Sequence, residues 1–214
     1  MKLLREYIDK LPTEFNPYEF IYKNIHYLNK DCKDILLEDL IKIDFNSLYP
    51  NIILGLYNEG LIDTKWNSDM KKLKSFLENI EELKKKSQPP YPEDPLSYKL
   101  GRIHANELYG KIRSPLVVEY LNLIYSDIIK EYSEDIVYID VDMIICKGDI
   151  DISKIPAKSE VSKIEYFYIE NKKRYITFAN GQLETRGHSK FTNDDLLQLI
   201  KREIRTRRLN KLGI

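Results

Sequence analysis

The sequence of 214 residues is poor in cysteine and contains no long hydrophobic run. Its two cysteines, Cys32 and Cys146, are too few for a disulfide framework and lack the C-x-x-C spacing of a zinc site, which favours a reduced intracellular protein. No apolar run approaches the roughly 20 residues needed to span a bilayer. The charged residues directly after Met1 do not fit a secretory signal. We therefore expect a cytoplasmic protein without a membrane partner, located in the host cytoplasm if a mobile element encodes it.

An excess of charge of one sign is also absent. Lys and Arg together number 34, and so do Asp and Glu, which gives a net charge of zero. This balance excludes a histone-like polycation but leaves room for a local basic groove. An apolar fraction of 43% is enough for a core. At about 150 residues per domain, the length corresponds to one or two domains.

The first part of the chain is expected to hold short helices around one strand. We expect short helices over residues 1–39, interrupted by two prolines. The β-branched run 40–45 predicts a buried strand with Asp44 near its end. A helix is expected to start over 47–55, where a proline in the first turn is tolerated.

A helical hairpin is predicted next. Apolar residues recur every three or four positions over 67–86, and a second helix is expected over 96–111. The proline-rich stretch 87–95 cannot be helical. Because this connection is short, the two helices should run antiparallel.

Strands dominate the expected C-terminal part, and a boundary near 148–158 would separate a small subdomain there. The acidic turn Asp140-Val141-Asp142 should join two strands as a hairpin. The elements expected in this part are a helix over 115–131, strands over 135–139, 143–147, 164–169 and 175–179, and a capped amphipathic helix over 192–209.

Three aspartates suggest one chemical site. Asp44 ends a predicted buried strand, and Asp140 and Asp142 lie at a predicted hairpin turn. Carboxylates at strand ends of one sheet can converge and hold two Mg²⁺ ions for phosphoryl transfer. Alternation places Asp140 and Asp142 on one face of a regular strand, whereas a turn would separate them. The plainer alternative is an acidic turn that is only solvated.

Four segments, in order along the chain, resemble the motifs of family B DNA polymerases. Their sequences are Asp44-Phe-Asn-Ser-Leu-Tyr-Pro50 for motif A (D-x-x-S-L-Y-P), Arg102-Ile-His-Ala-Asn-Glu-Leu-Tyr-Gly110 for motif B (K-x-x-x-N-S-x-Y-G), Tyr138-Ile-Asp-Val-Asp142 for motif C (Y-x-D-T-D-S) and Lys173-Arg-Tyr175 for K-x-Y. The stretch Gly181–Arg186 is more loosely similar to the K-G-x-E-x-x-R segment that follows in the family.

The resemblance implies an α+β fold, with an antiparallel palm sheet backed by helices, an inserted fingers hairpin and a small C-terminal thumb. The corresponding segments are an N-terminal segment over 1–39, palm with motif A over 40–66, fingers over 67–111, palm with motif C over 112–150, and palm edge with thumb over 151–214. About forty residues before motif A are too few for an exonuclease domain, so proofreading by this chain is not expected.

The resemblance also implies roles for single residues. Asp44 and Asp142 would hold two Mg²⁺ ions, with Mn²⁺ as a substitute, and Asp140 would be a less critical catalytic carboxylate. The backbone N–H groups of Ser47 and Leu48 would bind the triphosphate at a helix start. Tyr49 would lie under the deoxyribose and reject a 2′-hydroxyl. Arg102, Asn106 and Tyr109 would face the incoming nucleotide from one helix face; ordinary packing is the alternative.

Basic residues near the end of the chain are expected to contact DNA. Lys172, Lys173 and Tyr175 would meet the primer-terminal backbone. Basic side chains on the C-terminal helix would bind duplex phosphates without reading sequence, with a solvated tail helix as the alternative. The residues concerned are Arg205, Arg207 and Arg208.

The sequence thus predicts a DNA-templated DNA polymerase that acts on primer–template DNA and dNTPs, alone or with a second polymerase chain or a processivity factor. Four positions depart from the motifs: Arg102 replaces Lys, Glu107 replaces Ser, and Val141 and Met143 replace Thr and Ser. Glu107 and the small thumb keep a catalytically degenerate, DNA-binding palm as the alternative, although both Asp44 and Asp142 are retained. A reverse transcriptase is less compatible, because its two aspartates are adjacent and Val141 separates them here.

Overall fold

The computed structural model describes residues 26–87, 94, 96–112, 115–171, 173–187 and 192–211. The described chain forms two compact units. The helical unit contains Phe45–Ile128 and Asp151–Lys158, and the sheet unit contains Ile25–Asp44, Ile129–Ile150 and Ser159–Ile214. Each unit is therefore assembled from segments that are distant in the sequence.

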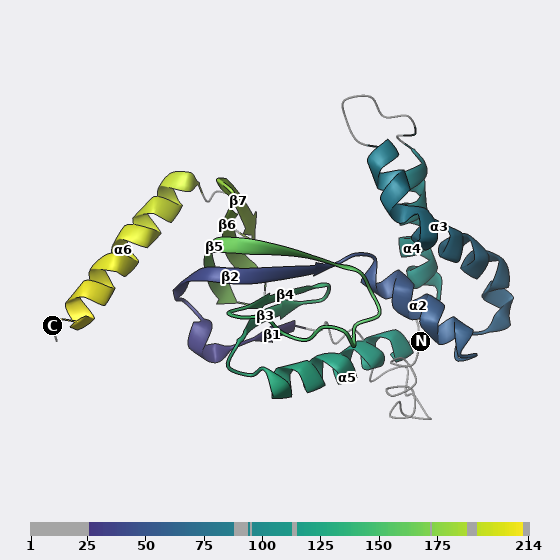
Figure 1. The fold of residues 1–214 in the computed structure, drawn as a ribbon, viewed down its shortest axis with the longest axis horizontal. Coiled ribbons are helices and arrows are strands. Elements are labelled where there is room, and N and C mark those ends of the chain that lie inside the picture. Colours follow the sequence, from purple (N-terminus) through teal and green to yellow (C-terminus); the bar gives the residue numbers. More distant parts are fainter. Residues whose placement is uncertain are drawn as a thin grey trace. The chain divides into compact units, whose positions relative to one another are not determined.

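Across the described residues, seven strands form one antiparallel sheet (Figure 1). The spatial order β1-β3-β4-β2-β5-β6-β7 places the motif A strand β2 beside the motif C hairpin. The strands are β1 (His26–Leu28), β2 (Leu36–Phe45), β3 (Ile136–Asp140), β4 (Met143–Cys146), β5 (Ser159–Asn171), β6 (Arg174–Ala179) and β7 (Gln182–Arg186). A short 3₁₀ turn, η1 (Lys30–Cys32), lies between β1 and β2, and helix α6 (Asn193–Lys211) follows β7.

The sheet is strongly curved, because aromatic side chains from strands that are not neighbours touch one another. The ring of Tyr138 on β3 lies 6.2 Å from Phe167 on β5 and 5.5 Å from Tyr175 on β6, between ring centroids. The rings of Phe167 and Tyr175 are 5.9 Å apart. Aliphatic side chains including Leu40 and Ile145 complete this buried cluster. The concave face of the sheet therefore carries its own apolar core.

The helical unit is built around an antiparallel hairpin. Its elements are α2 (Leu48–Asn58), the 3₁₀ turn η2 (Thr64–Trp66), α3 (Asn67–Lys86), α4 (Ser97–Ile112) and most of α5 (Pro115–Glu131). Asp69 on α3 lies 4.0 Å from His104 on α4, and the ring of Phe76 lies 6.4 Å from that of Tyr98. These contacts pair residues in opposite order along the two helices, which confirms the predicted antiparallel hairpin.

A glycine allows the two hairpin helices to approach closely. A Cβ atom added at Gly101 would lie 2.2 Å from the Phe76 ring, a distance that requires the ring to move. Phe76 is buried, together with Met70 and Leu73 on the same face of α3. This glycine inside α4 therefore reflects packing rather than a helix end.

Most elements were predicted from the sequence, with one clear error. The α+β class, the antiparallel sheet and the helices of the hairpin and of α5 are confirmed, with ends within one residue for α3, α4 and α5. The expected short helices are wrong over 26–39, where β1, η1 and the first residues of β2 lie instead. Strand pairing overrides the weak helical pattern there, since β1 pairs with β3. The part of that prediction over 1–25 lies outside the described residues.

The β6–β7 hairpin was not predicted. Asn180 and Gly181 form its two-residue turn, both with positive φ angles of 51° and 75°, between the paired residues Ala179 and Gln182. This is the geometry that Asn-Gly favours in hairpins. None of the helices in the described ranges is long and apolar enough to cross a membrane.

Candidate active site

The strand register places two aspartates on either side of one methionine. Asp44 near the end of β2 and Asp140 at the end of β3 both pair with Met143, the first residue of β4. Directly paired residues point to the same face of a sheet. Asp44 and Asp140 therefore lie on the concave face with one strand between theirs, although they are 96 positions apart in the sequence.

Asp142 lies in the hairpin turn and not on a strand. Asp140 pairs with Met143, so Val141 and Asp142 form the turn between them. Val141 has a φ angle of +53°, which is rare for a β-branched residue. The turn thus separates the two aspartates of motif C, as one of the two sequence-based interpretations expected.

The Asp142 carboxylate lies close enough to Asp44 for the two charges to interact. The pKa of Asp142 is raised, first by partial desolvation of its carboxylate and then by the negative charge of Asp44. A backbone hydrogen bond and the charge of Lys42 oppose this rise. Two carboxylates that repel one another are the expected electrostatic state of a site that takes a cation between them.

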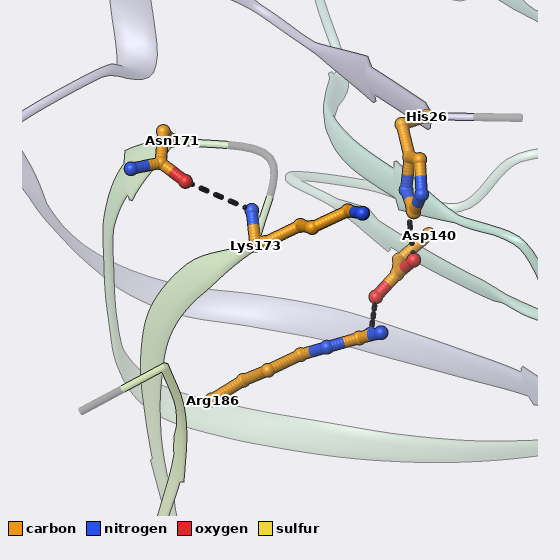
Figure 2. Close-up of polar contacts among 5 residues, drawn as sticks. All are labelled: His26, Asp140, Asn171, Lys173 and Arg186. Atoms are coloured by element: carbon orange, nitrogen blue, oxygen red, sulfur yellow. Dashed lines mark hydrogen bonds and ion pairs between the residues drawn. The ribbon is translucent and has the colours of Figure 1, made fainter. Parts of the chain in front are cut away.

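Asp140 has a different environment. Its side chain is only 1% exposed, and its Oδ1 lies 2.8 Å from Nδ1 of His26 on β1. The guanidinium of Arg186, from β7, forms an ion pair with Oδ2 (Figure 2). Both carboxylate oxygens of Asp140 are therefore engaged by neighbouring side chains, whereas the Asp44 side chain is 45% exposed. Of the three predicted catalytic carboxylates, only that of Asp140 is buried.

A lysine that the sequence analysis did not consider lies against Asp44. Nζ of Lys42 is 3.0 Å from Oδ2 of Asp44 and 3.6 Å from Oε2 of Glu184 on β7. Burial acts to lower the pKa of Lys42, but the hydrogen bonds and charges of Asp44 and Glu184 outweigh it and raise the pKa. Lys42 is therefore the cation next to Asp44 in this structure.

The donor set fits Mg²⁺. Among the residues that the structure describes, no group of three or more His, Cys, Asp or Glu side chains is arranged to enclose a metal ion. Asp44 on β2 and Asp142 in the β3–β4 turn would supply two carboxylates, which would leave further coordination positions for water or phosphate oxygens. Mg²⁺ is commonly held this way, by one or two carboxylates together with substrate phosphates, and not in a closed protein cage.

Tyr175 of the K-x-Y segment lies at the edge of this acidic group. The pKa of its hydroxyl is raised to about 12, first by burial and then by the negative charges of Asp44, Glu184 and Asp142. The Arg186 guanidinium lies 6.0 Å from the centre of its ring. The structure thus brings Tyr175 together with both predicted metal-binding aspartates.

Lys173 occupies the turn between β5 and β6. Its backbone N–H donates to Oδ1 of Asn171 at 3.0 Å, and its side chain is exposed (Figure 2). Lys172 lies outside the described residues. Arg205 is exposed on α6, whereas the side chains of Arg207 and Arg208 on the same helix lie outside the description.

In the helical unit, motif A begins a helix. Ser47 precedes α2 with a φ angle of +52°, and its side chain makes no capping hydrogen bond. Asn51 instead holds the turn, since its Nδ2 donates to the Ser47 carbonyl at 2.9 Å. The N–H groups of the first helical turn, including that of Leu48, have no acceptor within a helix. This end of α2 can therefore offer backbone donors to an anion.

Motifs A and B meet through two tyrosines. The rings of Tyr49 on α2 and Tyr109 on α4 are 4.7 Å apart between centroids, at an interplanar angle of 36°. Arg102 and Asn106 are exposed on α4, and the Arg102 guanidinium lies 5.8 Å from the ring of Tyr98. The predicted nucleotide-binding residues of the two motifs are thus gathered within the helical unit.

Four polar residues near the aspartates were given no role from the sequence. Lys42 could have been found, because alternation places it on the same strand face as Asp44. Glu184 and Arg186 were part of a noted segment, but only the curvature of the sheet brings them to β2 and β3. His26 carries no local signal, since its position depends on the pairing of β1 with β3.

Comparison with known proteins supports the fold. No protein-family model and no curated protein matches the chain. Solved structures do match. The family B DNA polymerase from the hyperthermophilic archaeon Pyrobaculum calidifontis is similar over 99% of this chain, with 15% identity and a TM-score of 0.50. The chain shares its fold with part of a DNA polymerase.

A second similar structure is Phi29 DNA polymerase complexed with primer–template DNA, which matches 92% of this chain with 12% identity and a TM-score of 0.53. Another Phi29 structure, complexed with single-stranded DNA, matches at 13% identity with a TM-score of 0.51. The match spans 38% of the archaeal polymerase and 60% of Phi29 polymerase. The likeness therefore concerns the fold of a portion of each of these larger enzymes.

Proposed function

We propose that this chain is a DNA-templated DNA polymerase, or the catalytic part of one, that transfers nucleotides from dNTPs to a primer 3′-hydroxyl. One observation carries the proposal. Asp44 and Asp142, the two acids of the polymerase-like motifs A and C, are placed next to each other by the strand register, because Asp44 pairs with Met143, the residue that directly follows Asp142. The fold shared with part of two DNA polymerases supports the same conclusion.

In this proposal Asp44 and Asp142 hold two Mg²⁺ ions, or Mn²⁺ in their place. Such ions, when bound, lower the pKa of the attacking hydroxyl and stabilise charge on the transferred phosphoryl group. The residues of the chain bind and orient the reactants. Backbone N–H groups at the start of α2 and the Arg102 guanidinium bind the triphosphate. Tyr49, held against Tyr109, contacts the sugar.

DNA contacts are assigned to the basic residues of the sheet unit. Lys173 and Tyr175 bind the primer-terminal backbone, and Arg205 on α6 binds duplex phosphates. Since few cations take part, we expect weak and salt-sensitive binding of primer–template DNA. A second polymerase chain or a processivity factor would then extend the time spent on DNA.

Primer extension tests the proposal directly. The purified 214-residue chain is given a primed DNA template, dNTPs and Mg²⁺, beside the variants Asp44→Asn and Asp142→Asn. Each variant should lose about a hundred- to a thousandfold in rate, as is usual when a group that stabilises transition-state charge is removed. Asp149→Asn, which removes an exposed carboxylate of the sheet unit, serves as the matched control. Full activity of Asp142→Asn would contradict the assignment.

A second candidate is a non-catalytic palm that binds primer–template DNA. The observation in its favour is Lys42, whose ammonium already neutralises Asp44 at 3.0 Å. Fluorescence anisotropy with primed DNA separates the two. A binding module would hold DNA equally well with and without Asp44 and Asp142 and would extend no primer, even when a partner chain is added.

A further inference from the structure

Lys42 occupies an unusual position for a lysine. It lies inside strand β2, two residues before Asp44 on the same strand face, and its side chain is only 20% exposed. A buried ammonium loses hydration and is retained only where carboxylates compensate for that loss. Here two carboxylates do so: Asp44 on its own strand at 3.0 Å and Glu184 on β7 at 3.6 Å.

The ammonium and a metal ion would compete for the same oxygen atoms. Oδ2 of Asp44 lies 3.0 Å from Lys42 Nζ, and Asp44 is one of the two carboxylates assigned to the metal. A divalent cation at Asp44 would lie within a few ångström of the ammonium and repel it. Since Lys42 cannot leave its strand, its side chain must change partner when the metal binds.

A second partner is already in place. Glu184 is 67% exposed, and its Oε2 accepts a hydrogen bond from Oγ1 of Thr177 at 3.5 Å, across the β6–β7 pair. Lys42 and Glu184 both line a pocket of about 150 Å³, to which β5, β6 and β7 also contribute. The lysine side chain therefore has room to move away from Asp44 while it stays beside Glu184.

We propose that Lys42 is an internal counter-ion that neutralises Asp44 in the metal-free protein, competes with the divalent cation for this carboxylate, and transfers to Glu184 when the cation binds. The inference rests on the proposed function, because it takes Asp44 and Asp142 as the metal ligands. It makes Lys42 and Glu184 positioning residues that set metal affinity without touching the metal.

Two single variants should shift metal affinity in opposite directions. Lys42→Met removes the competing charge, so Mn²⁺ should bind about three- to tenfold more tightly. Glu184→Gln removes the alternative partner and leaves Lys42 on Asp44, so Mn²⁺ should bind several-fold more weakly. The negative charge of Glu184 also attracts the metal directly. The double variant Lys42→Met/Glu184→Gln measures this direct effect, because no ammonium is left to transfer. In the Lys42→Met background, the effect of Glu184→Gln should fall to less than half of its size on a logarithmic scale.

The experiment is a titration of the full chain with Mn²⁺ alone, in which electron paramagnetic resonance measures free Mn²⁺. No DNA or nucleotide is present, so the readout is independent of polymerase activity. Lys147→Met is the matched control, since it removes another lysine of the same unit whose Nζ donates to the Glu134 carbonyl at 3.2 Å. The affinity of Lys147→Met for Mn²⁺ should stay within about twofold of the wild-type affinity. Lys42→Arg, which keeps the charge, should not bind more tightly than the wild type.

Each outcome points to a different conclusion. Unchanged or weaker binding by Lys42→Met overturns competition, and Lys42→Gln repeats that test if the Met variant does not fold. If Glu184→Gln weakens Mn²⁺ binding by the same factor in the wild type and in Lys42→Met, the transfer of Lys42 to Glu184 is overturned. The proposed function fails separately, if Asp44→Asn binds Mn²⁺ as tightly as the wild type or if the wild type binds none.

Discussion

Asp140 at the end of β3 and Arg186 at the end of β7 form an ion pair, although β4, β2, β5 and β6 lie between these strands in the sheet. Only a strongly curved sheet allows this contact. The pair therefore closes the concave face next to Asp44 and Asp142, and it does so with a carboxylate that is 1% exposed. A buried carboxylate of this kind depends on its partners for its charge to be tolerated.

Replacement of Asp140 should therefore affect folding more than metal binding. Asp140→Asn leaves Arg186 and His26 facing a neutral amide, and we expect a loss of about 3 kcal/mol in the free energy of unfolding. Urea denaturation followed by circular dichroism measures the loss. In a double-mutant cycle with Arg186→Leu, the two residues should show a coupling of about 1 kcal/mol or more. A stable Asp140→Asn protein that no longer binds Mn²⁺ would instead make Asp140 a metal ligand.

The raised pKa of Asp142 gives a stability prediction with a defined sign. A carboxyl whose pKa is raised in the folded state holds its proton more tightly there than in the unfolded chain. Its charged form therefore destabilises the fold, and this cost grows as pH rises from the unfolded value of about 3.9 through the raised folded value. Asp142→Asn should raise the melting temperature of the metal-free protein at pH 7, and the gain should vanish below about pH 4.

Thermal melts in EDTA between pH 4 and 7 measure this gain. Asp149→Asn, at an exposed position of the same unit, is the control that should show no comparable gain. A lower melting temperature of Asp142→Asn at pH 7 would contradict the interpretation that Asp44 and Asp142 repel one another.

Two glycines of α4 should respond in opposite directions to the same substitution. Ala is favoured over Gly in a helix by about 1 kcal/mol. At Gly110 an added Cβ meets no atom within 4 Å, so Gly110→Ala should stabilise the protein by up to that amount. At Gly101 the Cβ would lie 2.2 Å from the Phe76 ring, and overpacking of about 1–3 kcal/mol should exceed the gain.

Denaturation of both variants, and of Gly101→Ala with Phe76→Leu, tests the packing argument. The smaller leucine should remove part of the clash, so the double variant should be less destabilised than the sum of the two single variants. Equal stabilisation by both alanines would show that α3 and α4 are not in close contact at Gly101.

Under the proposed function, the contact between Tyr49 and Tyr109 leads us to expect that selectivity against ribonucleotides depends on both residues. Tyr49→Ala should increase ribonucleotide incorporation relative to dNTPs by about tenfold or more, because a steric block is removed. Tyr109→Ala should produce a smaller increase, since Tyr49 loses the ring that lies 4.7 Å away. Tyr109→Phe keeps the ring and should stay near the wild type. Single-nucleotide extension with dNTP or rNTP gives the ratio for each variant, and an unchanged ratio in Tyr109→Ala would contradict the coupling.

The sequence was most informative where structure depends on local patterns. The helices α3, α4 and α5 follow from apolar spacing and from prolines at their ends, and the β3–β4 hairpin follows from two β-rich runs around an acidic turn. The sequences that resemble motifs A and C also identified Asp44 and Asp142, which the structure brings together. Each of these features is determined by a short, continuous stretch of the sequence.

Features that depend on sheet curvature could not be predicted in the same way. Lys42 and Glu184 are 142 positions apart, and Asp140 meets His26 and Arg186 only because β1 pairs with β3 and the sheet bends. The strand β1 has only three residues, too short for a pattern. The Asn180-Gly181 turn is an exception, because an Asn-Gly pair is by itself a local signal for a tight hairpin turn.

The strand order has a consequence for how the chain folds. Strand β2 lies between β4 and β5, which are made about a hundred residues later, whereas α2, α3 and α4 follow one another and contact mainly each other. On the ribosome, the helical hairpin can therefore form early, while β2 must wait with unpaired edges for the C-terminal half to appear. The acidic site is completed last, when β7 brings Glu184 and Arg186 to the sheet, and the partly synthesised chain is the state most exposed to aggregation.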